Sequence, residues 1–276
     1  MAGTTLTGRL SGLEYGFATE ADDAGLRALL RETPMGGAIR LTLEREPSFF
    51  ASVRREGSRH YTICVRDAGK IVAMASRTVW PTGVGYLHQL RIAPSYRHLT
   101  RQFLRIGFRM LRETHAADEA PYDVTTIVSD NHIARRVLEA GLPGMPTYRS
   151  IEKILTILVP AGRRSGNAID QRAYKQIVVR GYSPALSRWR WLLRLPPVGT
   201  VLPIVYIMNF NGDLDQLEGA PAGCRWLALG LPSSHPLVPV VKRRYGSRVY
   251  ESTLYVVHEP GQTPDVGNLR WEVAWL

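Results

Sequence analysis

Cysteine is scarce in this sequence of 276 residues, which contains only Cys64 and Cys224. Two thiols so far apart in sequence form neither a disulfide framework nor a metal-binding motif. His235 and His258 lack the spacing of metal ligands as well, so we expect no metal site. The first ten residues also lack the apolar core of a signal peptide, and the expectation is therefore a cytoplasmic, reduced protein.

Long apolar runs are equally rare. One largely apolar stretch, Leu192–Phe210, contains Arg194 and three prolines, which exclude a spanning helix. It follows Arg188-Trp189-Arg190-Trp191, and two interpretations of the region remain open. The Trp/Arg cluster could make a peripheral contact with a membrane surface, or it could be a helix end that leads into a buried strand.

Acidic residues are too few to balance the basic ones. The chain has 35 basic and 24 acidic residues, a formal charge of +11, and only four of the basic residues are lysines. Because an arginine bias often reflects codon usage in a GC-rich genome, we expect no nucleic-acid partner from charge alone. A positive field favours anionic ligands, such as a phosphorylated cofactor, an acidic carrier protein or a phospholipid surface. The length and a hydrophobic content of 45% suit two modest domains with real cores.

Hydrophobic periodicity in the first 160 residues predicts alternating strands and helices. The predicted strands cover 14–19, 59–67, 70–79, 85–92, 122–128 and 148–159, and the predicted helices cover 22–31, 47–55, 100–114 and 131–139. A loop over 33–37 separates the first two helices. The helix over 100–114 has an apolar face and a separate arginine stripe. This order predicts an α/β fold, with a mixed central sheet flanked by helices.

The second half repeats part of that order. Strands are expected at 174–180, 202–209, 225–229 and 249–257, with a Trp/Arg-rich helix after the first and a helix over 236–245 before the last. Between Asn209 and Arg225 there is no room for a helix like 100–114. Polar residues replace apolar ones near 162–167, which predicts domains over 1–162 and 163–276, the second a shortened copy of the first.

The run Leu90-Arg91-Ile92-Ala93-Pro94-Ser95-Tyr96-Arg97 resembles the signature strand and loop of GNAT acyltransferases, V-x-P-x-Y-R. Asn131 with Ala134 resembles a later family motif, N-x-x-A. Both halves together resemble a bacterial group of tandem GNAT proteins, and four pieces of the second half carry this: Asp170–Gln176, Val178–Tyr182, Leu229–Leu231 and His235–Leu237. The resemblance implies a GNAT fold with a second, shortened GNAT-like domain.

The resemblance also implies acetyl-CoA or another acyl-CoA as cofactor. In the family a strand bulge opens the sheet edge to the pantetheine arm, and the pyrophosphate lies on the start of the next helix. The resemblance implies that the cofactor-binding residues of this sequence are Leu90, Arg91, Ile92, Arg97, His98, Leu99, Thr100, Arg101, Gln102 and Asn131. The sequence departs from the pattern in three places. His98, Thr100 and Gln102 replace loop glycines, Leu138 replaces a tyrosine acid, and Gly141 falls one position early.

Loss of the glycines restricts how closely backbone approaches a pyrophosphate, and Arg97, Arg101 or Arg105 could compensate by pairing with phosphate directly. The arginine stripe of 100–114 is either a solvated face or a docking patch for an acyl carrier protein or the adenosine phosphate.

His88 occupies the position of the family's usual carboxylate base, four residues before the V of V-x-P. A histidine with an ordinary pKa near 6.5 could serve as the base, or it could simply be hydrogen-bonded within the sheet. Backbone N–H groups of Leu90 or Arg91 could hold the oxyanion. Tyr122, like Tyr148, is either a catalytic acid or a packing aromatic.

The loop with Gly36, Gly37 and Arg40 lies where the family contacts its acceptor, and Arg40 could bind a carboxylate.

The sequence thus predicts an enzyme, an N-acyltransferase that moves an acyl group from acyl-CoA to a small-molecule or peptide amine. Two alternatives stay open. One is a non-catalytic GNAT scaffold that binds a partner or an acyl ligand, and the other is transfer of a long acyl chain from an acyl carrier protein.

Overall fold

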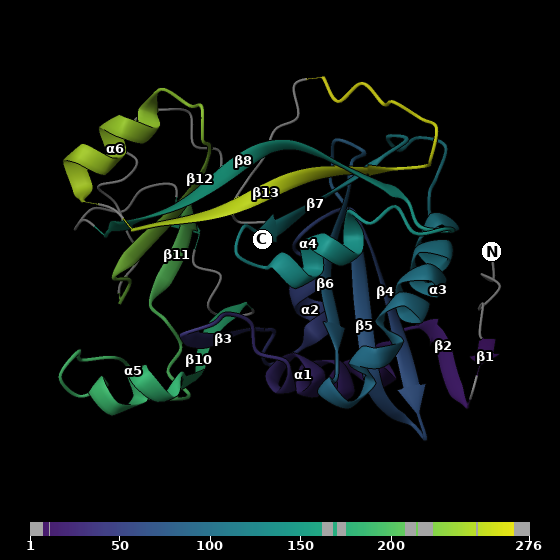
Figure 1. Cartoon of the computed structure of the whole chain (residues 1–276), viewed down its shortest axis with the longest axis horizontal. Coiled ribbons are helices and arrows are strands. Elements are labelled where there is room, and N and C mark those ends of the chain that lie inside the picture. Colours follow the sequence, from purple (N-terminus) through teal and green to yellow (C-terminus); the bar gives the residue numbers. More distant parts are fainter. Residues whose placement is uncertain are drawn as a thin grey trace. The chain divides into compact units, whose positions relative to one another are not determined.

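The computed structural model describes residues 8–10, 12–161, 168–169, 175–207, 214, 223–246 and 248–267. They form two compact units, each drawn from several parts of the chain (Figure 1). Unit 1 comprises residues within Met1–Gly83, Leu87–Asp118 and Ala173–Leu202, and unit 2 comprises residues within Val84–Tyr86, Glu119–Arg172 and Pro203–Leu276. Both units use residues from either side of position 162, so the spatial division differs from the predicted sequence repeat, whose boundary stays a prediction.

Unit 1 contains an antiparallel sheet with helices, and a separate two-stranded ribbon. Its elements are β1 (Gly8–Leu10), β2 (Leu13–Phe17), η1 (Glu20–Asp22), α1 (Asp23–Glu32), β3 (Ile39–Glu44), α2 (Phe49–Val53), β4 (Arg59–Asp67), β5 (Lys70–Val79), most of β6 (Gly85–Ile92), η2 (Pro94–Leu99), α3 (Thr100–Arg112), β10 (Gln176–Tyr182) and α5 (Pro184–Trp189). The strand order is β1-β2-β4-β5-β6, and β3 pairs with β10 in the ribbon.

Two helices of unit 1, α1 and α3, pack on this sheet through the apolar faces that their periodicity predicts. Leu26, Leu29 and Leu30 of α1 are almost completely buried, and α1 contacts β5. Phe103 and Leu104 of α3 are buried as well, and α3 contacts β4 and β5. The apolar faces of α1 and α3 therefore both contribute to the core of unit 1.

The β4–β5 hairpin closes where the sequence predicts, at Ala68-Gly69. Both residues adopt left-handed backbone conformations, with φ of 46° and 82°. A turn with two left-handed residues matches the twist of antiparallel strands, which explains the tight connection.

The region after the first helix corrects the sequence-based expectation. We predicted a loop through the glycines and no strand before the second helix, but Ile39–Glu44 forms β3. Its partner is β10, in which Gln176 lies opposite Glu44 and Tyr182 opposite Ile39. Local patterns miss such a strand because its partner lies about 130 residues away along the chain.

Unit 2 is built around long antiparallel strands. Its elements are β7 (Asp123–Val128), α4 (His132–Leu138), β8 (Thr147–Pro160), β9 (Ala168–Ile169), β11 (Ile204–Ile207), β12 (Trp226–Pro232), α6 (Leu237–Tyr245) and β13 (Arg248–His258). The strand order is β7-β13-β8-β12-β11-β9, and Gly85 and Tyr86 of β6 pair in parallel with Asp123 and Val124 of β7. Apolar residues of β8, β11, β12 and α6 form one core cluster. Most of the stretch between Asn209 and Arg225 lies outside the described residues, so the expectation that it has no helix is not addressed.

Candidate functional site

The strand with the family-like motif is kinked in its middle. Gln89 of β6 has a φ of +55°, a left-handed conformation that is uncommon for residues other than glycine and asparagine. The residue is 7% exposed, and the next residues, Leu90 and Arg91, are partly buried. A left-handed residue within a strand breaks the regular alternation, as a bulge does. The kink falls directly before the two residues whose N–H groups were predicted to hold an oxyanion.

A buried arginine holds the kink. Arg45 donates to the amide oxygen of Gln89 through both Nη2 and Nε, in the amide orientation that satisfies both groups. Its Nη1 lies 2.7 Å from Ser52 Oγ, and its Nη2 lies 3.0 and 2.9 Å from the two carboxylate oxygens of Glu56. Lys175 Nζ is 3.1 Å from Glu56 Oε1. A buried ion cluster of two cations and one anion therefore stands behind the left-handed residue.

Burial of this cluster disfavours its charged forms, and the mutual pairing of the groups opposes that effect. The side chains of Arg45, Glu56 and Lys175 are 0%, 8% and 1% exposed. Burial by itself raises the pKa of Glu56, but the positive charges of Arg45 and Lys175 outweigh it and hold that pKa far below its usual value. For Lys175 burial is the larger effect, and it lowers the pKa despite the nearby carboxylate. Sequence patterns did not single out these three residues, because they meet only in the folded chain.

Two histidines share one hydroxyl beside this cluster. Thr78 Oγ1 lies 2.8 Å from His88 Nε2 and 2.7 Å from His60 Nδ1. The chain of contacts continues from His60 Nε2 to Thr62 Oγ1 at 2.8 Å, and from there to Ser76 Oγ at 2.8 Å. Since a hydroxyl has one proton, Thr78 can donate to only one of the two imidazoles and must accept from the other.

Both imidazoles are neutral at physiological pH. Burial, the largest cause, lowers the pKa of His88 well below its usual 6.5, although Glu56 acts in the opposite direction. Burial and the charge of Arg45 lower the pKa of His60 to about 3. The expectation of an ordinary pKa for His88 is therefore corrected. Its role as the base stays a prediction, because a neutral imidazole can still accept a proton.

The predicted phosphate-binding residues gather at the start of α3. The turn η2 runs directly into α3, and no side chain caps the helix at Leu99. Arg97, His98 and Arg101 are exposed there, and Thr100 Oγ1 donates to the Arg97 carbonyl at 2.6 Å. Three basic residues thus surround an N-terminus where the helix dipole favours anions. The side chain of Gln102 instead turns to the sheet and donates to the Tyr15 hydroxyl at 3.1 Å.

Two other predicted site residues, Asn131 and Tyr122, belong to unit 2, as does Leu138, which replaces the family's tyrosine acid. Asn131 caps α4, where its side chain accepts from the N–H of Ala134 at 3.2 Å. Tyr122 is 7% exposed, and burial, with Asp265, raises its pKa. Leu138, at the position of the family's tyrosine acid, is buried. These residues have clear structural roles in unit 2, and the cofactor role of Asn131 and the catalytic role of Tyr122 stay predictions.

Two of the predicted acceptor-contacting residues, Gly36 and Gly37, lie in the turn that leads into β3. Met35 and Leu41 exchange backbone hydrogen bonds of 2.7 and 2.8 Å. Gly36 has a φ of +96°, and a Cβ added there would lie 2.5 Å from the Ile39 carbonyl oxygen. A Cβ on Gly37 would meet nothing within 4 Å. Only the first glycine is therefore required by the backbone.

Arg40 follows this turn as an exposed residue of β3. Its guanidinium lies over Gly181 of β10, 2.9 Å from where a Cβ of that glycine would be, and its Nη2 lies 3.5 Å from the Tyr182 carbonyl oxygen. A carboxylate on Arg40 would have to compete with this weak contact.

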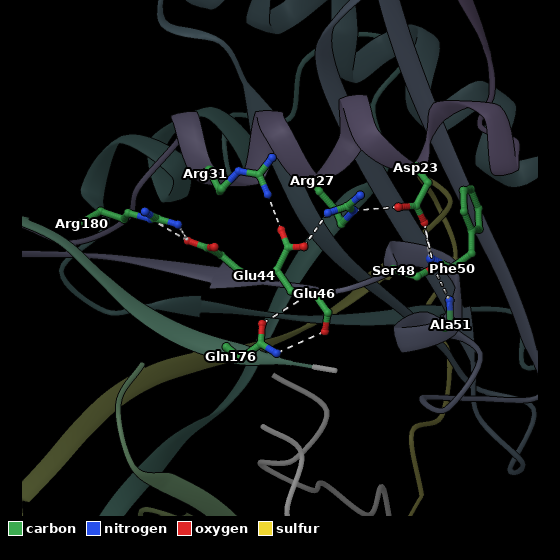
Figure 2. A network of polar contacts seen from close by, with 10 residues as sticks. All are labelled: Asp23, Arg27, Arg31, Glu44, Glu46, Ser48, Phe50, Ala51, Gln176 and Arg180. Carbon is green, nitrogen blue, oxygen red and sulfur yellow. Dashed lines mark hydrogen bonds and ion pairs between the residues drawn. The ribbon is translucent and has the colours of Figure 1, made fainter. Parts of the chain in front are cut away.

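A network of ion pairs fastens the β3–β10 ribbon to α1 (Figure 2). Arg27 and Arg31 of α1 both pair with Glu46, and Gln176 of β10 makes two hydrogen bonds of 3.3 and 3.2 Å with the Glu46 backbone. Within the ribbon, Arg180 of β10 pairs with Glu44 of β3. These contacts tie the end of β3, and the residues after it, to α1 and β10.

The same network reaches the start of α2. Figure 2 shows Asp23 between Arg27, at 2.7 Å, and Ser48, whose hydroxyl donates at 2.9 Å. Ser48 also caps α2 by accepting from the N–H of Ala51 at 3.2 Å. The short helix that carries Ser52 is thereby held in place, and with it one partner of Arg45.

No protein-family model matches the sequence, and no curated protein matches it either. Solved structures do match. The GCN5-related N-acetyltransferase of Sphaerobacter thermophilus is 14% identical, with 92% of this chain and 98% of that one covered and a TM-score of 0.50. A tandem GNAT protein from the clavulanic acid biosynthesis pathway is also 14% identical, with 91% and 99% covered and a TM-score of 0.51. At these identities the likeness establishes the fold alone, and it extends over nearly the whole of this chain.

Proposed function

We propose, from the GNAT fold that this chain shares with a tandem GNAT protein, that it is an N-acyltransferase whose acyl-CoA site lies in unit 1. The observation that carries the proposal is the kink at Gln89 in β6. It lies five residues before the first residue of the turn η2, which leads into the basic start of α3. An irregular strand near an anion-binding helix start is the arrangement that the resemblance to GNAT acyltransferases implies for an acyl-CoA site.

The residues at the start of α3 fit the phosphates of such a cofactor. Arg97, His98 and Arg101 are exposed and lie at the positive end of the helix dipole. Because side chains occupy the positions of the family's glycines, direct pairing by arginine would replace close backbone approach. When bound, acyl-CoA supplies the activated acyl thioester.

The chain's own groups would act on the acyl carbonyl and on the acceptor nitrogen. The N–H of Leu90 or Arg91 would donate to the carbonyl oxygen, and Arg45 would keep these donors in position through Gln89. His88 would accept the proton that the acceptor nitrogen releases as it is acylated. In this account Arg45, Glu56 and Lys175 are positioning residues, since they act through Gln89.

A second candidate function is a scaffold that binds an acyl ligand or a partner without turnover. It is favoured by the residues that replace the loop glycines, above all Gln102, whose side chain is already bonded to Tyr15. A third, transfer from an acyl carrier protein, would use the arginine stripe of α3 as the docking patch.

A thermal-shift panel separates the three candidates, because a ligand of the folded state raises the melting temperature. The panel contains acetyl-CoA, a long-chain acyl-CoA and an acylated carrier protein. The proposal expects stabilisation by an acyl-CoA, followed by thiol release when a panel of amines is added. Stabilisation without thiol release for every amine would favour the scaffold. Stabilisation only by the acylated carrier protein would favour the third candidate.

A further inference from the structure

The segment that follows β10 in unit 1 exposes an unusual amount of apolar surface. Six of the eleven exposed large hydrophobic residues among the described residues lie within positions 189–201. Their exposed fractions are 59% for Trp189, 83% for Trp191, 74% for Leu192, 52% for Leu193, 54% for Val198 and 43% for Val201. Single exposed apolar residues are common on proteins, whereas a cluster indicates an interaction surface. Residues 183–202 are called the Trp/Arg segment below.

The Trp/Arg segment is held at both ends. Its first residue, Ser183, donates its N–H to the Ala38 carbonyl at 2.8 Å and caps α5 by accepting from the N–H of Leu186 at 3.4 Å. At the far end, the N–H groups of Gly199 and Leu202 donate to carbonyls of β10 at 2.7 and 2.8 Å. The segment therefore leaves β10 and returns to it. Its tip, residues 188–194, is held in place by these attachments at both ends.

The positive charge of the tip favours an anionic binding partner. The tip contains Arg188, Arg190 and Arg194, and the sequence has no acidic residue from position 171 to position 212. The Arg190 guanidinium lies 4.9 Å from the ring centre of Trp191, a cation–π arrangement. Tryptophan and arginine side by side suit the boundary between lipid headgroups and acyl chains.

We infer that the Trp/Arg segment docks unit 1 on the surface of a membrane that contains anionic phospholipid. Trp191 and Leu192 would enter the interface, and the three arginines would pair with lipid phosphates. The contact is peripheral, since none of the helices among the described residues has the length and the apolar run needed to cross a bilayer. An acidic protein partner would match the arginines, but the four large apolar side chains exposed beside them, Trp189, Trp191, Leu192 and Leu193, favour a lipid surface.

Vesicle sedimentation tests the inference with the full chain. The probes are phosphatidylcholine vesicles with and without phosphatidylglycerol, at low and at high salt. We expect sedimentation with the anionic vesicles that weakens at high salt. The double variant Trp191→Ser/Leu192→Ser should lower the affinity by about tenfold or more, because each large apolar side chain adds substantial transfer free energy. The matched control is Ile133→Ser, which removes a side chain that is 80% exposed on α4.

Several outcomes would overturn the inference. The first is a wild-type protein that stays in solution with anionic vesicles, and the second is a double variant that binds them as well as the wild type. Light scattering adds a third arm. If the wild type forms a dimer and does not bind vesicles, and the double variant is a monomer, the surface would be assigned to a second copy of the chain. If the wild type binds an acidic carrier protein but no vesicles, and the double variant has lost that binding, the surface would be assigned to a protein partner. Equal melting temperatures of the two variants and the wild type verify folding.

Discussion

Glu56 lies between Arg45 and Lys175 with 8% of its side chain exposed, and it compensates two charges that are almost completely buried. A buried charge that loses its paired carboxylate is strongly disfavoured. The exposed pair of Glu20 and Arg54, with side chains 63% and 64% exposed, contrasts with it, because water screens both of its members. The two glutamates therefore have very different importance for stability.

Replacing Glu56 with Gln should lower the free energy of unfolding by about 3–5 kcal/mol, since it removes the carboxylate that pairs with the buried Arg45 guanidinium. The matched control, Glu20→Gln, should change it by less than about 1 kcal/mol. Urea denaturation of both variants provides the measurement. Equal effects of the two substitutions would show that the Arg45 cluster is not the buried unit described above.

The two partly buried histidines, His60 and His88, predict a loss of stability in mild acid. Their folded-state pKa values are lowered from 6.5, to about 3 for His60 and well below 6.5 for His88. Below pH 6.5 the unfolded chain therefore binds protons that the folded chain does not, so the stability present above that pH is lost as the pH falls. The expected loss is about 1.4 kcal/mol per pH unit for each histidine.

Denaturation between pH 7 and pH 5 measures this slope, above the range of Glu56, whose unfolded value is 4.5. His60→Gln should reduce the slope by about half, since it removes one of two such groups. His98→Gln, at an exposed position, is the control. A wild-type protein with flat stability over this window would show that the imidazoles are not held neutral.

The proposed role of His88 gives a kinetic prediction. His88→Ala should lower kcat/KM by roughly 100-fold or more while leaving acyl-CoA affinity nearly intact. Because burial lowers its pKa, the acid limb of the wild-type rate should lie well below pH 6.5. Single-turnover rates and melting temperatures are measured on one preparation. A stable, fully active variant would remove His88 from the mechanism.

At the scale of elements, the acceptor-side turn depends on one of its two adjacent glycines. A side chain at Gly36 would be strained by its φ of +96° and would collide with the Ile39 carbonyl oxygen, whereas one at Gly37 meets open space. Gly36→Ala should lower the free energy of unfolding by about 1–3 kcal/mol, and Gly37→Ala should be nearly neutral. Thermal denaturation of the pair measures this. A neutral Gly36→Ala would mean that the turn before β3 differs from the one described.

Elements with strong periodicity could be predicted from the sequence alone. The strands over 70–79 and 85–92 are confirmed as Lys70–Val79 and Gly85–Ile92, and the helix that starts at Thr100 ends two residues earlier than expected. The ribbon strand β3 and the ion cluster behind Gln89 could not be predicted. Both depend on β10 or on the residue before it, about 120 residues or more away, and no local pattern encodes such a distant partner.

At the scale of the whole molecule, the chain has two compact units but, in the proposed function, one cofactor site. Nine of the ten predicted cofactor residues lie in β6, η2 and the start of α3. A shortened second copy is expected to lack an equivalent helix. The chain should therefore bind one acyl-CoA, although its fold matches a tandem GNAT protein over most of its length.

Calorimetric titration with CoA tests this claim most directly. The account predicts one equivalent bound per chain. The double variant Arg97→Ser/Arg101→Ser should weaken binding by about tenfold or more, because it removes charged partners of the phosphates. Lys242→Ser/Arg243→Ser, at exposed positions of α6, should bind like the wild type. Two equivalents per chain, no binding, or binding that the Arg97→Ser/Arg101→Ser variant retains in full would contradict the account.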